Sequence, residues 1–243
     1  MQALILAAGM AERLRPLTLN HPKCLVEIGG KTFMERMITN LLKHDIRDIN
    51  IITGFQVDKL KSYVGEKFPE LSVNYYHNDR YFETNNSYSL WLAKHLIRED
   101  FLLFDADIIF DHRILDLLLN SEHSDCLALR TAPDLGEEEM KVRVDDRNRV
   151  LEISKTIAPH EAAGESLGIE KFSKDMGKLL FDKLEHNILS LGGENDFYEK
   201  SFEDIISDGA NLYAIDVGDY RCAEVDFAED ILHVEREILP HIE

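Results

Sequence analysis

The sequence predicts an α/β fold in which a mixed, mostly parallel sheet is sandwiched by helices. Over the first hundred residues, short apolar runs of strand length alternate with segments of helical periodicity, the pattern of βαβ units. The strand runs resemble the buried strands of a parallel sheet; they are residues 3–6, 49–53, 72–76 and 101–104. Ligands bind beyond the carboxyl ends of such strands, so we expect the functional residues there.

Helical patterns fill the intervals between these strands. Apolar residues recur at helical spacing between Phe33 and Leu42, a second helix is expected over 57–68, and a third begins near Asn86.

The character of the chain changes after about residue 135. Segments 141–144 and 150–154 flank a polar turn and predict a hairpin. A strand near 166–172, helices near 174–191 and 198–207, a strand over 212–217 and a helix over 227–239 follow. In the last helix Phe227, Ile231, Val234 and Ile238 share one face. We predict a single domain over 1–243, with a core over 1–134 and an elaboration over 135–243.

Composition narrows the range of partners. The formal net charge is −19, from 46 acidic and 27 basic residues. Such a field repels nucleic acid and anionic membranes, so we expect neither as a partner. It also repels phosphorylated substrates, so a phosphate site has to concentrate its cations locally.

Cysteine usage and hydropathy indicate a cytoplasmic protein. Cys24, Cys126 and Cys222 are odd in number and widely spaced, which gives neither a disulfide framework nor a zinc pattern. No stretch reaches the roughly 18 apolar residues that span a membrane.

A small-residue loop follows the first expected strand. Backbone N–H groups of such a loop can approach phosphates closely, and Arg13 and Lys23 can supply the missing positive charge. The P-loop pattern fails at Leu25, and the dinucleotide fingerprint fails at Ala11 and Leu14. A bare glycine turn could equally be an ordinary surface turn.

The complete run is more specific than a glycine turn. It reads Leu6-Ala7-Ala8-Gly9-x-x-x-Arg13-Leu14-x-Pro16-Leu17-Thr18, then Pro22-Lys23-x-Leu25 and Gly30-Lys31. This run closely resembles the sugar-phosphate nucleotidyltransferase superfamily. The resemblance implies a Rossmann-like nucleotidyltransferase fold, with a nucleotide-binding core over 1–134 and an acceptor-binding elaboration with a closing strand and helix over 135–243.

The same resemblance implies roles for the loop residues. Arg13 and Lys23 would act on the triphosphate as catalytic residues, and the backbone of Leu6, Ala7, Ala8 and Gly9 would approach the base and ribose. The family usually has glycine at position 11, so Ala11 leaves its backbone contacts to phosphate open.

Two acidic segments are candidates for a metal site. Asp105 and Asp107 end the run 101–104 and would project together at the sheet edge, where carboxylates suit Mg²⁺. An isolated pair of this kind also occurs in caps and solvated turns, and in phosphatases near the N-terminus. The acidic run 223–230 resembles the superfamily's closing segment, which implies Asp107 and Asp226 as magnesium ligands. Asp105 and Glu224 would support them, although Asp226 alone could be a helix N-cap.

The run from Thr84 to Lys94 bears on the substrate. Its Asn-Asn-x-Tyr-Ser-Leu pattern looks like the bacterial phosphocholine cytidylyltransferases and their aminoethylphosphonate-using relatives. This likeness implies CTP as the donor and nucleotide-binding roles for Asn85, Asn86 and Ser87. Taken without the likeness, the same residues could be a helix cap followed by core positions.

The acceptor site is assigned by the resemblance together with chemistry. Lys155 stands where the superfamily holds the acceptor phosphate, and Glu165 begins the strand that lines the acceptor pocket. Aromatic faces and carboxylates hold choline-type cations, and Tyr88, Trp91 and Tyr198 are the aromatic candidates. A solvated charge at Lys155, and packing for the three rings, are the structural alternatives.

We therefore predict a Mg²⁺-dependent nucleotidyltransferase. It would transfer CMP from CTP to a small phosphorylated or phosphonate amine or alcohol, such as phosphocholine, and release pyrophosphate. A phosphomonoester is largely dianionic at neutral pH, so no general base is needed. The rival readings are a sugar-1-phosphate nucleotidyltransferase that uses UTP, GTP or dTTP, and a catalytically silent nucleotide-sensing domain. The exact acceptor, the pathway and the oligomeric state stay open.

Overall fold

A computed structural model describes residues 1–131 and 135–242. Its main sheet has nine strands; seven run in the order β10-β9-β11-β6-β1-β4-β5, and β8 joins β11 to β12. The bounds are β1 (Gln2–Ala7), β4 (Asp48–Thr53), β5 (Val73–His77), β6 (Phe101–Asp105), β8 (Cys126–Arg130), β9 (Lys141–Val144), β10 (Val150–Ser154), β11 (Gly164–Phe172) and β12 (Tyr213–Asp216). Strands β6, β1, β4 and β5 are parallel, whereas β11 runs antiparallel to β6, β8 and β9. The predicted mixed, mostly parallel sheet is confirmed.

Two small antiparallel ribbons lie outside this sheet. The first pairs β7 (Ile108–Phe110) with β13 (Cys222–Glu224), and places Glu224 opposite Ile108. The second pairs β2 (Glu27–Ile28) with β3 (Lys31–Thr32). The first ribbon matters for function, because it brings the chain near residue 224 beside the end of β6.

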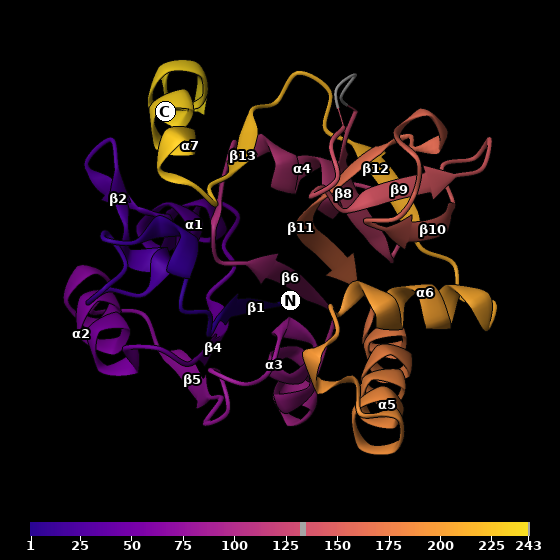
Figure 1. Ribbon diagram of the computed structural model, residues 1–243, viewed down its shortest axis with the longest axis horizontal. Coiled ribbons are helices and arrows are strands. Elements are labelled where there is room, and N and C mark those ends of the chain that lie inside the picture. The colour runs from indigo at the N-terminus through magenta and orange to yellow at the C-terminus, as the bar shows by residue number, and fades with distance from the viewer. Residues whose placement is uncertain (132–134, 243) are drawn as a thin grey trace.

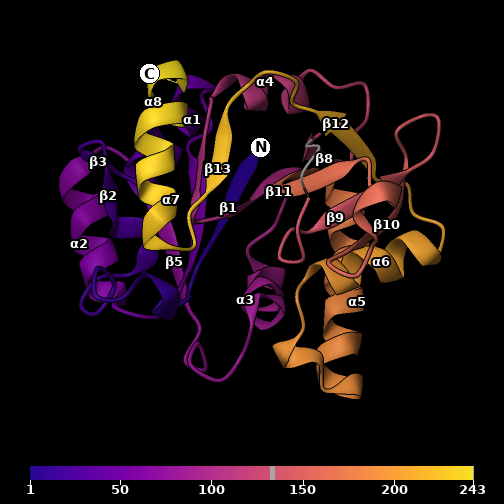
Figure 2. The same cartoon turned by 45° about the horizontal axis from the view of Figure 1, so that its top comes forward.

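Helices cover both faces of the sheet. They are α1 (Phe33–Lys43), α2 (Val57–Lys67), α3 (Asn86–Leu92), α4 (Arg113–Leu119), α5 (Lys174–Leu191), α6 (Glu199–Ser207), α7 (Ala228–His233) and α8 (Leu239–Ile242). Figures 1 and 2 show α1 and α2 at one end of the molecule, and β9, β10 and α6 at the other. None of the helices within the described residues has the length and apolar character needed to cross a membrane.

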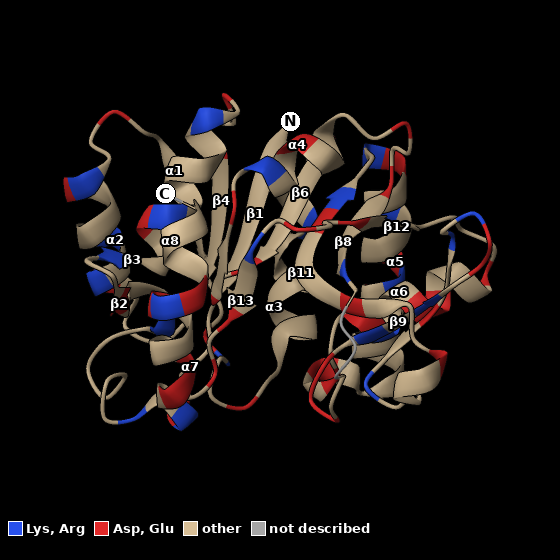
Figure 3. Ribbon diagram, turned by 90° about the horizontal axis from the view of Figure 1, so that it is seen from above, with Lys and Arg blue, Asp and Glu red and all other residues tan. Residues whose placement is uncertain are grey.

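The two faces are set by the alternation of side chains along β1. Ala3 and Ile5 pack with residues of α1, α2 and α4, and Leu4 and Leu6 pack with residues of α3, α5 and α6. Burying each such Leu or Ile side chain contributes roughly 1.5–3 kcal/mol. Figure 3 shows the consequence: the central strands are largely free of charged residues, which gather on the outer helices and loops.

A third hydrophobic cluster holds the segments that carry the charged site residues. Leu14, which follows Arg13, packs in one cluster with Val225, which lies between Glu224 and Asp226. Val234 and Ile238 of the C-terminal helices complete this cluster. The apolar neighbours thus fix the backbone on which the charged side chains stand.

The end of the chain differs from the sequence expectation. Instead of one helix over 227–239, α7 leads into a π-helical turn (Val234–Ile238) and then α8. Phe227 is the N-cap residue, is 40% exposed, and lies beneath the Arg13 guanidinium, whose carbon is 5.1 Å from the ring centroid. The prediction that Phe227 belongs to the apolar face of the last helix was therefore wrong, because that helix begins one residue later.

Several elements were not expected from the sequence. They are β2, β3, β7, β8 and α4. The first three are only two or three residues long, too short for any periodicity to be visible.

Candidate active site

A pocket of about 850 Å³ lies at the carboxyl ends of β1 and β6. The end of β1 contributes Leu6 and Ala7, and the end of β6 contributes Asp105. Segments of β11 and β13 and the start of α3 complete the lining. This is the edge at which open parallel sheets bind ligands, and it is where the sequence placed the site.

The glycine loop forms one wall of this pocket. Ala8, Gly9 and Ala11 line it, as the sequence predicts for the first two. Ala11 has a φ of 47°, in the left-handed region, and its carbonyl accepts a 2.7 Å hydrogen bond from Thr18 Oγ1. Glycine would adopt this φ at lower cost. Contacts such as the hydrogen bond from Thr18, and not the intrinsic backbone preference of alanine, therefore hold Ala11 in this conformation.

Lys23 lies between two acidic side chains of the pocket. Its Nζ donates 2.7 Å hydrogen bonds to Oδ2 of Asp107 and to Oδ1 of Asp226. Burial alone would lower the pKa of Lys23, but the two carboxylates outweigh it and raise that pKa above its ordinary value. Lys23 is therefore a permanent cation beside the glycine loop.

Arg13 contacts the second carboxylate oxygen of Asp226. Its Nη2 lies 3.0 Å from Oδ2 of Asp226, and its Nη1 lies 4.0 Å from Oε2 of Glu138. Half of its side chain is exposed, so an entering anion can reach the guanidinium. The two predicted catalytic cations are thus brought together around Asp226.

Three carboxylates gather at this end of the pocket. Ligand oxygens of Asp107, Glu224 and Asp226 all lie within 4.8 Å of one another. Oδ1 of Asp107 is buried and has no hydrogen-bond partner in the described part of the chain. Burial, followed by the charges of Asp107 and Asp226, raises the pKa of Glu224 to about 8. This all-oxygen donor set fits Mg²⁺.

A second set of cations lines the same pocket. Lys155 Nζ lies 3.6 Å from Oε2 of Glu138 and 4.8 Å from the ring centroid of Phe197. Arg130 Nη2 lies 2.6 Å from Oε1 of Glu165. All five side chains line the pocket, so the predicted residues Lys155 and Glu165 face the same space. Arg130 and Phe197 also line it, although the sequence did not suggest them.

Glu199 is an acidic lining residue that the sequence reasoning missed. Glu199 is 7% exposed, and its Oε2 is buried without a hydrogen-bond partner among the described residues. Burial raises its pKa to about 7. A glutamate in the first turn of a helix is ordinary in a sequence, so no local signal distinguished it.

Asp105 in the pocket lining is close to a further buried acid, Glu170. Asp105 Oδ2 accepts a 3.0 Å hydrogen bond from the Tyr198 hydroxyl. Burial, then the charge of Asp107, raises the pKa of Asp105, and burial, then the charge of Asp105, raises that of Glu170. Asp105 thus supports the floor of the pocket through a buried hydrogen bond.

The three aromatic acceptor candidates are corrected by the structure. Tyr88, Trp91 and Tyr198 are absent from the described lining of the pocket. Trp91 packs against the core on the α3–α5–α6 side, with its ring centroid 5.4 Å from that of Tyr88. Tyr198 is fully buried. Tyr88 is half-buried, and its ring centroid lies 5.1 Å from the Arg80 guanidinium carbon. For Trp91 and Tyr198, packing is the alternative that the sequence left open.

Part of the asparagine run lines the pocket, and part of it has a structural role. Asn85 and Asn86 line the pocket, but Ser87 is 2% exposed and does not, so its nucleotide contact was wrong. Oδ1 of Asn86 accepts a 3.0 Å hydrogen bond from the backbone N–H of Tyr198. The run therefore ties α3 to the start of α6 as well as facing the pocket.

Comparison with known proteins agrees with this geometry. The family model described as "Nucleotidyl transferase" matches residues 2–137. Choline-phosphate cytidylyltransferase of Streptococcus pneumoniae is 41% identical over 107 residues, a segment that spans 44% of this chain and 44% of that protein. CTP:phosphoglutamine cytidylyltransferase of Campylobacter jejuni is 26% identical over 253 aligned positions, which cover 95% of this chain and 98% of that protein.

Solved structures show the same fold. The structure of CTP:phosphocholine cytidylyltransferase from Streptococcus pneumoniae matches with a TM-score of 0.79 and 25% identity, over 96% of this chain and 97% of that one. The inositol-1-phosphate CTP transferase of T. maritima matches with a TM-score of 0.80 and 20% identity, over 98% and 97%. The second likeness bears on the fold alone.

Proposed function

The chain belongs to the nucleotidyl transferase family, and from that premise we propose that it transfers CMP from CTP to a small phosphorylated amine, with release of pyrophosphate. The choice of CTP is supported by the two relatives from Streptococcus pneumoniae and Campylobacter jejuni, both of which are cytidylyltransferases. The choice of an amine is supported by charges in the pocket.

The observation that carries the proposal is the cluster of Lys23 and Arg13 beside the glycine loop. Both cations have carboxylate partners at 2.7–3.0 Å, and a triphosphate can replace those partners with its own oxygens. Positive charge fixed in advance at this place stabilises the negative charge that develops on the leaving pyrophosphate. Because the pKa of Lys23 is raised, its charge persists throughout the neutral pH range.

The transfer itself needs little proton chemistry. An oxygen of the acceptor's phosphate dianion attacks the α-phosphorus of CTP, and the bond between that phosphorus and the pyrophosphate oxygen breaks. Since the attacking oxygen is already deprotonated, no side chain has to act as a base. The protein's residues hold the two substrates in line, which accounts for much of the rate.

Asp107, Glu224 and Asp226 would hold Mg²⁺, as their shared oxygen cluster suits this ion. When bound, Mg²⁺ supplies further neutralisation of the triphosphate oxygens. Lys23 donates to Oδ2 of Asp107 and to Oδ1 of Asp226, and Oδ1 of Asp107, without a partner among the described residues, would be available to the metal.

The part of the pocket that Lys155 lines supports a cationic acceptor. Lys155 and Arg130 can bind the acceptor's phosphate, while Glu199 presents a buried oxygen without a partner among the described residues. An ammonium group would pair with that carboxylate and could contact the Phe197 ring. A sugar ring offers hydroxyl groups but no cation to pair with Glu199.

Product identification by ³¹P NMR tests the proposal. The protein is incubated with Mg²⁺, CTP and phosphocholine, phosphoethanolamine or 2-aminoethylphosphonate in turn, with Lys23→Ala as the matched control. We expect pyrophosphate together with the coupled resonances of a new phosphoanhydride. Conversion of CTP to CMP and pyrophosphate at the same rate with and without acceptor would contradict a transferase.

A further inference from the structure

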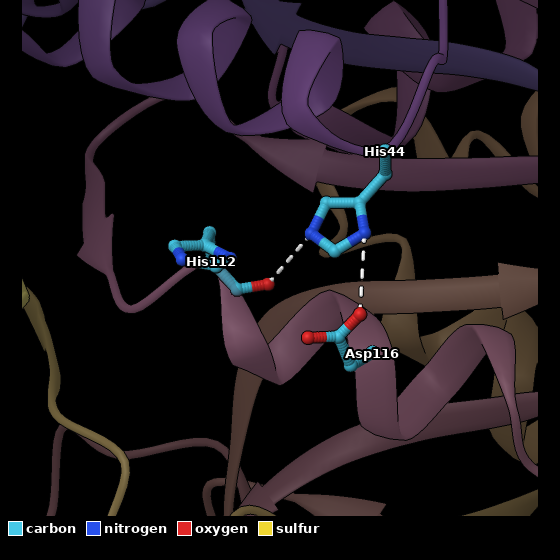
Figure 4. A group of neighbouring side chains, drawn as sticks. All are labelled: His44, His112 and Asp116. Carbon is cyan, nitrogen blue, oxygen red and sulfur yellow. Dashed lines mark hydrogen bonds and ion pairs between the residues drawn. The ribbon is translucent and has the colours of Figure 1, made fainter.

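A second cluster of potential ligands lies outside the active-site pocket. His44 is the C-cap residue of α1, His112 is the N-cap residue of α4, and Asp116 lies within α4. Figure 4 shows the His44 ring between the backbone oxygen of His112 and the carboxylate of Asp116. Their ligand atoms all lie within 4.8 Å of one another, and none of the three residues lines the pocket.

The His44 ring is placed between two acceptors. Its Nε2 lies 3.0 Å from the backbone oxygen of His112, and its Nδ1 lies 3.4 Å from Oδ1 of Asp116. A neutral imidazole has a single N–H. If that N–H donates to the nearer carbonyl, the Nδ1 lone pair faces a carboxylate oxygen, and two such atoms are held together by a cation between them.

The distance between these two atoms fits a tetrahedral metal ion. Charge-assisted hydrogen bonds between nitrogen and carboxylate oxygen are about 2.7–2.9 Å long, shorter than the 3.4 Å between His44 and Asp116. Zinc holds imidazole nitrogen and carboxylate oxygen each at about 2.0–2.2 Å, so tetrahedral geometry separates the two ligand atoms by about 3.4 Å. The 3.4 Å spacing therefore matches the separation of two ligands that share a metal ion.

His112 supplies the third ligand. Its Nδ1 is buried and has no hydrogen-bond partner among the described residues. A neutral imidazole keeps one ring nitrogen without a proton, and that nitrogen can bind a metal. His112 and Asp116 are four positions apart at the start of one helix, a spacing that brings both side chains to one face.

We propose that His44, His112 and Asp116 form a binding site for a zinc-like divalent cation that links the end of α1 to the start of α4. The three residues leave one coordination position for water. The N–H of His44 that faces the His112 carbonyl fixes the ring, as the second nitrogen of metal-bound histidines commonly does. Two imidazoles favour Zn²⁺, Co²⁺ or Ni²⁺ over Mg²⁺.

Titration with Co²⁺ tests this site without reference to activity. The protein is freed of metal with a chelator and titrated in excess Mg²⁺, which occupies all-carboxylate sites. Binding is followed by visible absorption, with Zn²⁺ displacement and the melting temperature as second readouts. The variants are His44→Gln and Asp116→Asn, and the control is His186→Gln, an exposed histidine of α5. The Asp116 side chain is 51% exposed, so its variant is expected to fold.

We expect one equivalent of Co²⁺ to bind to the wild type and to His186→Gln, with a rise in melting temperature. In His44→Gln and Asp116→Asn, affinity should fall by at least about tenfold. Equal affinity in all four proteins would place the metal elsewhere and overturn the proposal. The absence of Co²⁺ binding by the wild type at stoichiometric concentrations would also overturn it.

Discussion

The ammonium nitrogen of Lys23 lies 2.7 Å from Oδ2 of Asp107, although 84 positions separate the two residues. Asp226, a further 119 positions along the chain, is equally close to Lys23 on its other side. The contact joins the glycine loop to the end of β6. A triphosphate competes with the carboxylates for Lys23, and a metal ion competes with Lys23 for the carboxylates. Each should therefore favour the binding of the other.

The first prediction concerns Asp107 and Asp226. We expect Asp107→Asn and Asp226→Asn each to lower kcat by at least about a hundredfold, because each removes a charge from the proposed Mg²⁺ ligands. Steady-state pyrophosphate release measures the effect. Asp79→Asn, at a side chain that is 92% exposed, is the control and should keep full activity. If either variant kept more than about a tenth of the wild-type kcat, the residue changed in that variant would not be a metal ligand.

The second prediction separates the two cations. Arg13→Ala should lower mainly kcat, because the guanidinium acts on charge that develops as pyrophosphate leaves. Lys23→Ala should lower kcat and raise the KM for CTP, since this buried ammonium also pairs with the ground-state phosphates. Arg47→Ala, whose side chain is 65% exposed, is the control. If both site variants behaved like the control, the loop would be an ordinary turn.

The third prediction concerns the acceptor. Glu199→Gln keeps the shape of the side chain but loses the charge that would pair with an ammonium group. We expect the KM for the acceptor to rise about tenfold or more, with the KM for CTP little changed. Glu203→Gln, on the same helix but outside the pocket lining, should change neither value. An unchanged acceptor KM in Glu199→Gln would remove Glu199 from the acceptor site.

The fourth prediction follows from the pKa of Glu199, which burial raises from 4.5 to about 7. A carboxyl group with a higher pKa in the folded state stabilises the fold below its unfolded pKa. That contribution is lost as pH rises from 4.5 to about 7. Relative to Glu199→Gln, the wild type should lose up to about 3 kcal/mol of unfolding free energy over this range. Parallel urea titrations measure it, and identical pH dependence in both proteins would contradict the shift.

The fifth prediction concerns Trp91, which packs against the core and not in the pocket. Trp91→Ala should lower the free energy of unfolding by about 2–4 kcal/mol through lost packing. The acceptor KM should stay within about twofold of the wild-type value, since losses in core packing act on stability. Chemical denaturation and steady-state kinetics together measure both. A specific rise in acceptor KM at unchanged stability would return Trp91 to the acceptor site.

Much of the fold and one half of the site could be predicted from sequence. Of the four strand runs in the parallel core, 3–6 and 101–104 are continuously apolar, and residues directly after such strands lie at one edge of the sheet. The run 72–76, in contrast, forms the edge strand β5, whose residues are exposed or half-buried. Arg13, Lys23 and Asp107 follow the first and fourth of these runs. Their convergence therefore depended on topology that local patterns reveal.

The acceptor end could not be predicted in the same way. Tyr88 and Trp91 stand on a short helix, α3, whose orientation is set by packing and not by local sequence. Glu199 became visible only in three dimensions, because its burial and its position near Lys155 depend on how α6 meets β10. Arg130 comes from β8, a strand that the sequence did not suggest.

The specificity constants of paired substrates test the central claim most directly. The values of kcat/KM are measured for CTP with phosphocholine, phosphoethanolamine and 2-aminoethylphosphonate, and for UTP, GTP and dTTP with glucose 1-phosphate. We predict that at least one CTP and amine pair exceeds every sugar-phosphate pair by about a hundredfold, the equivalent of one strong charged contact in the transition state. A sugar-phosphate pair that reacts faster than all CTP and amine pairs would contradict the account.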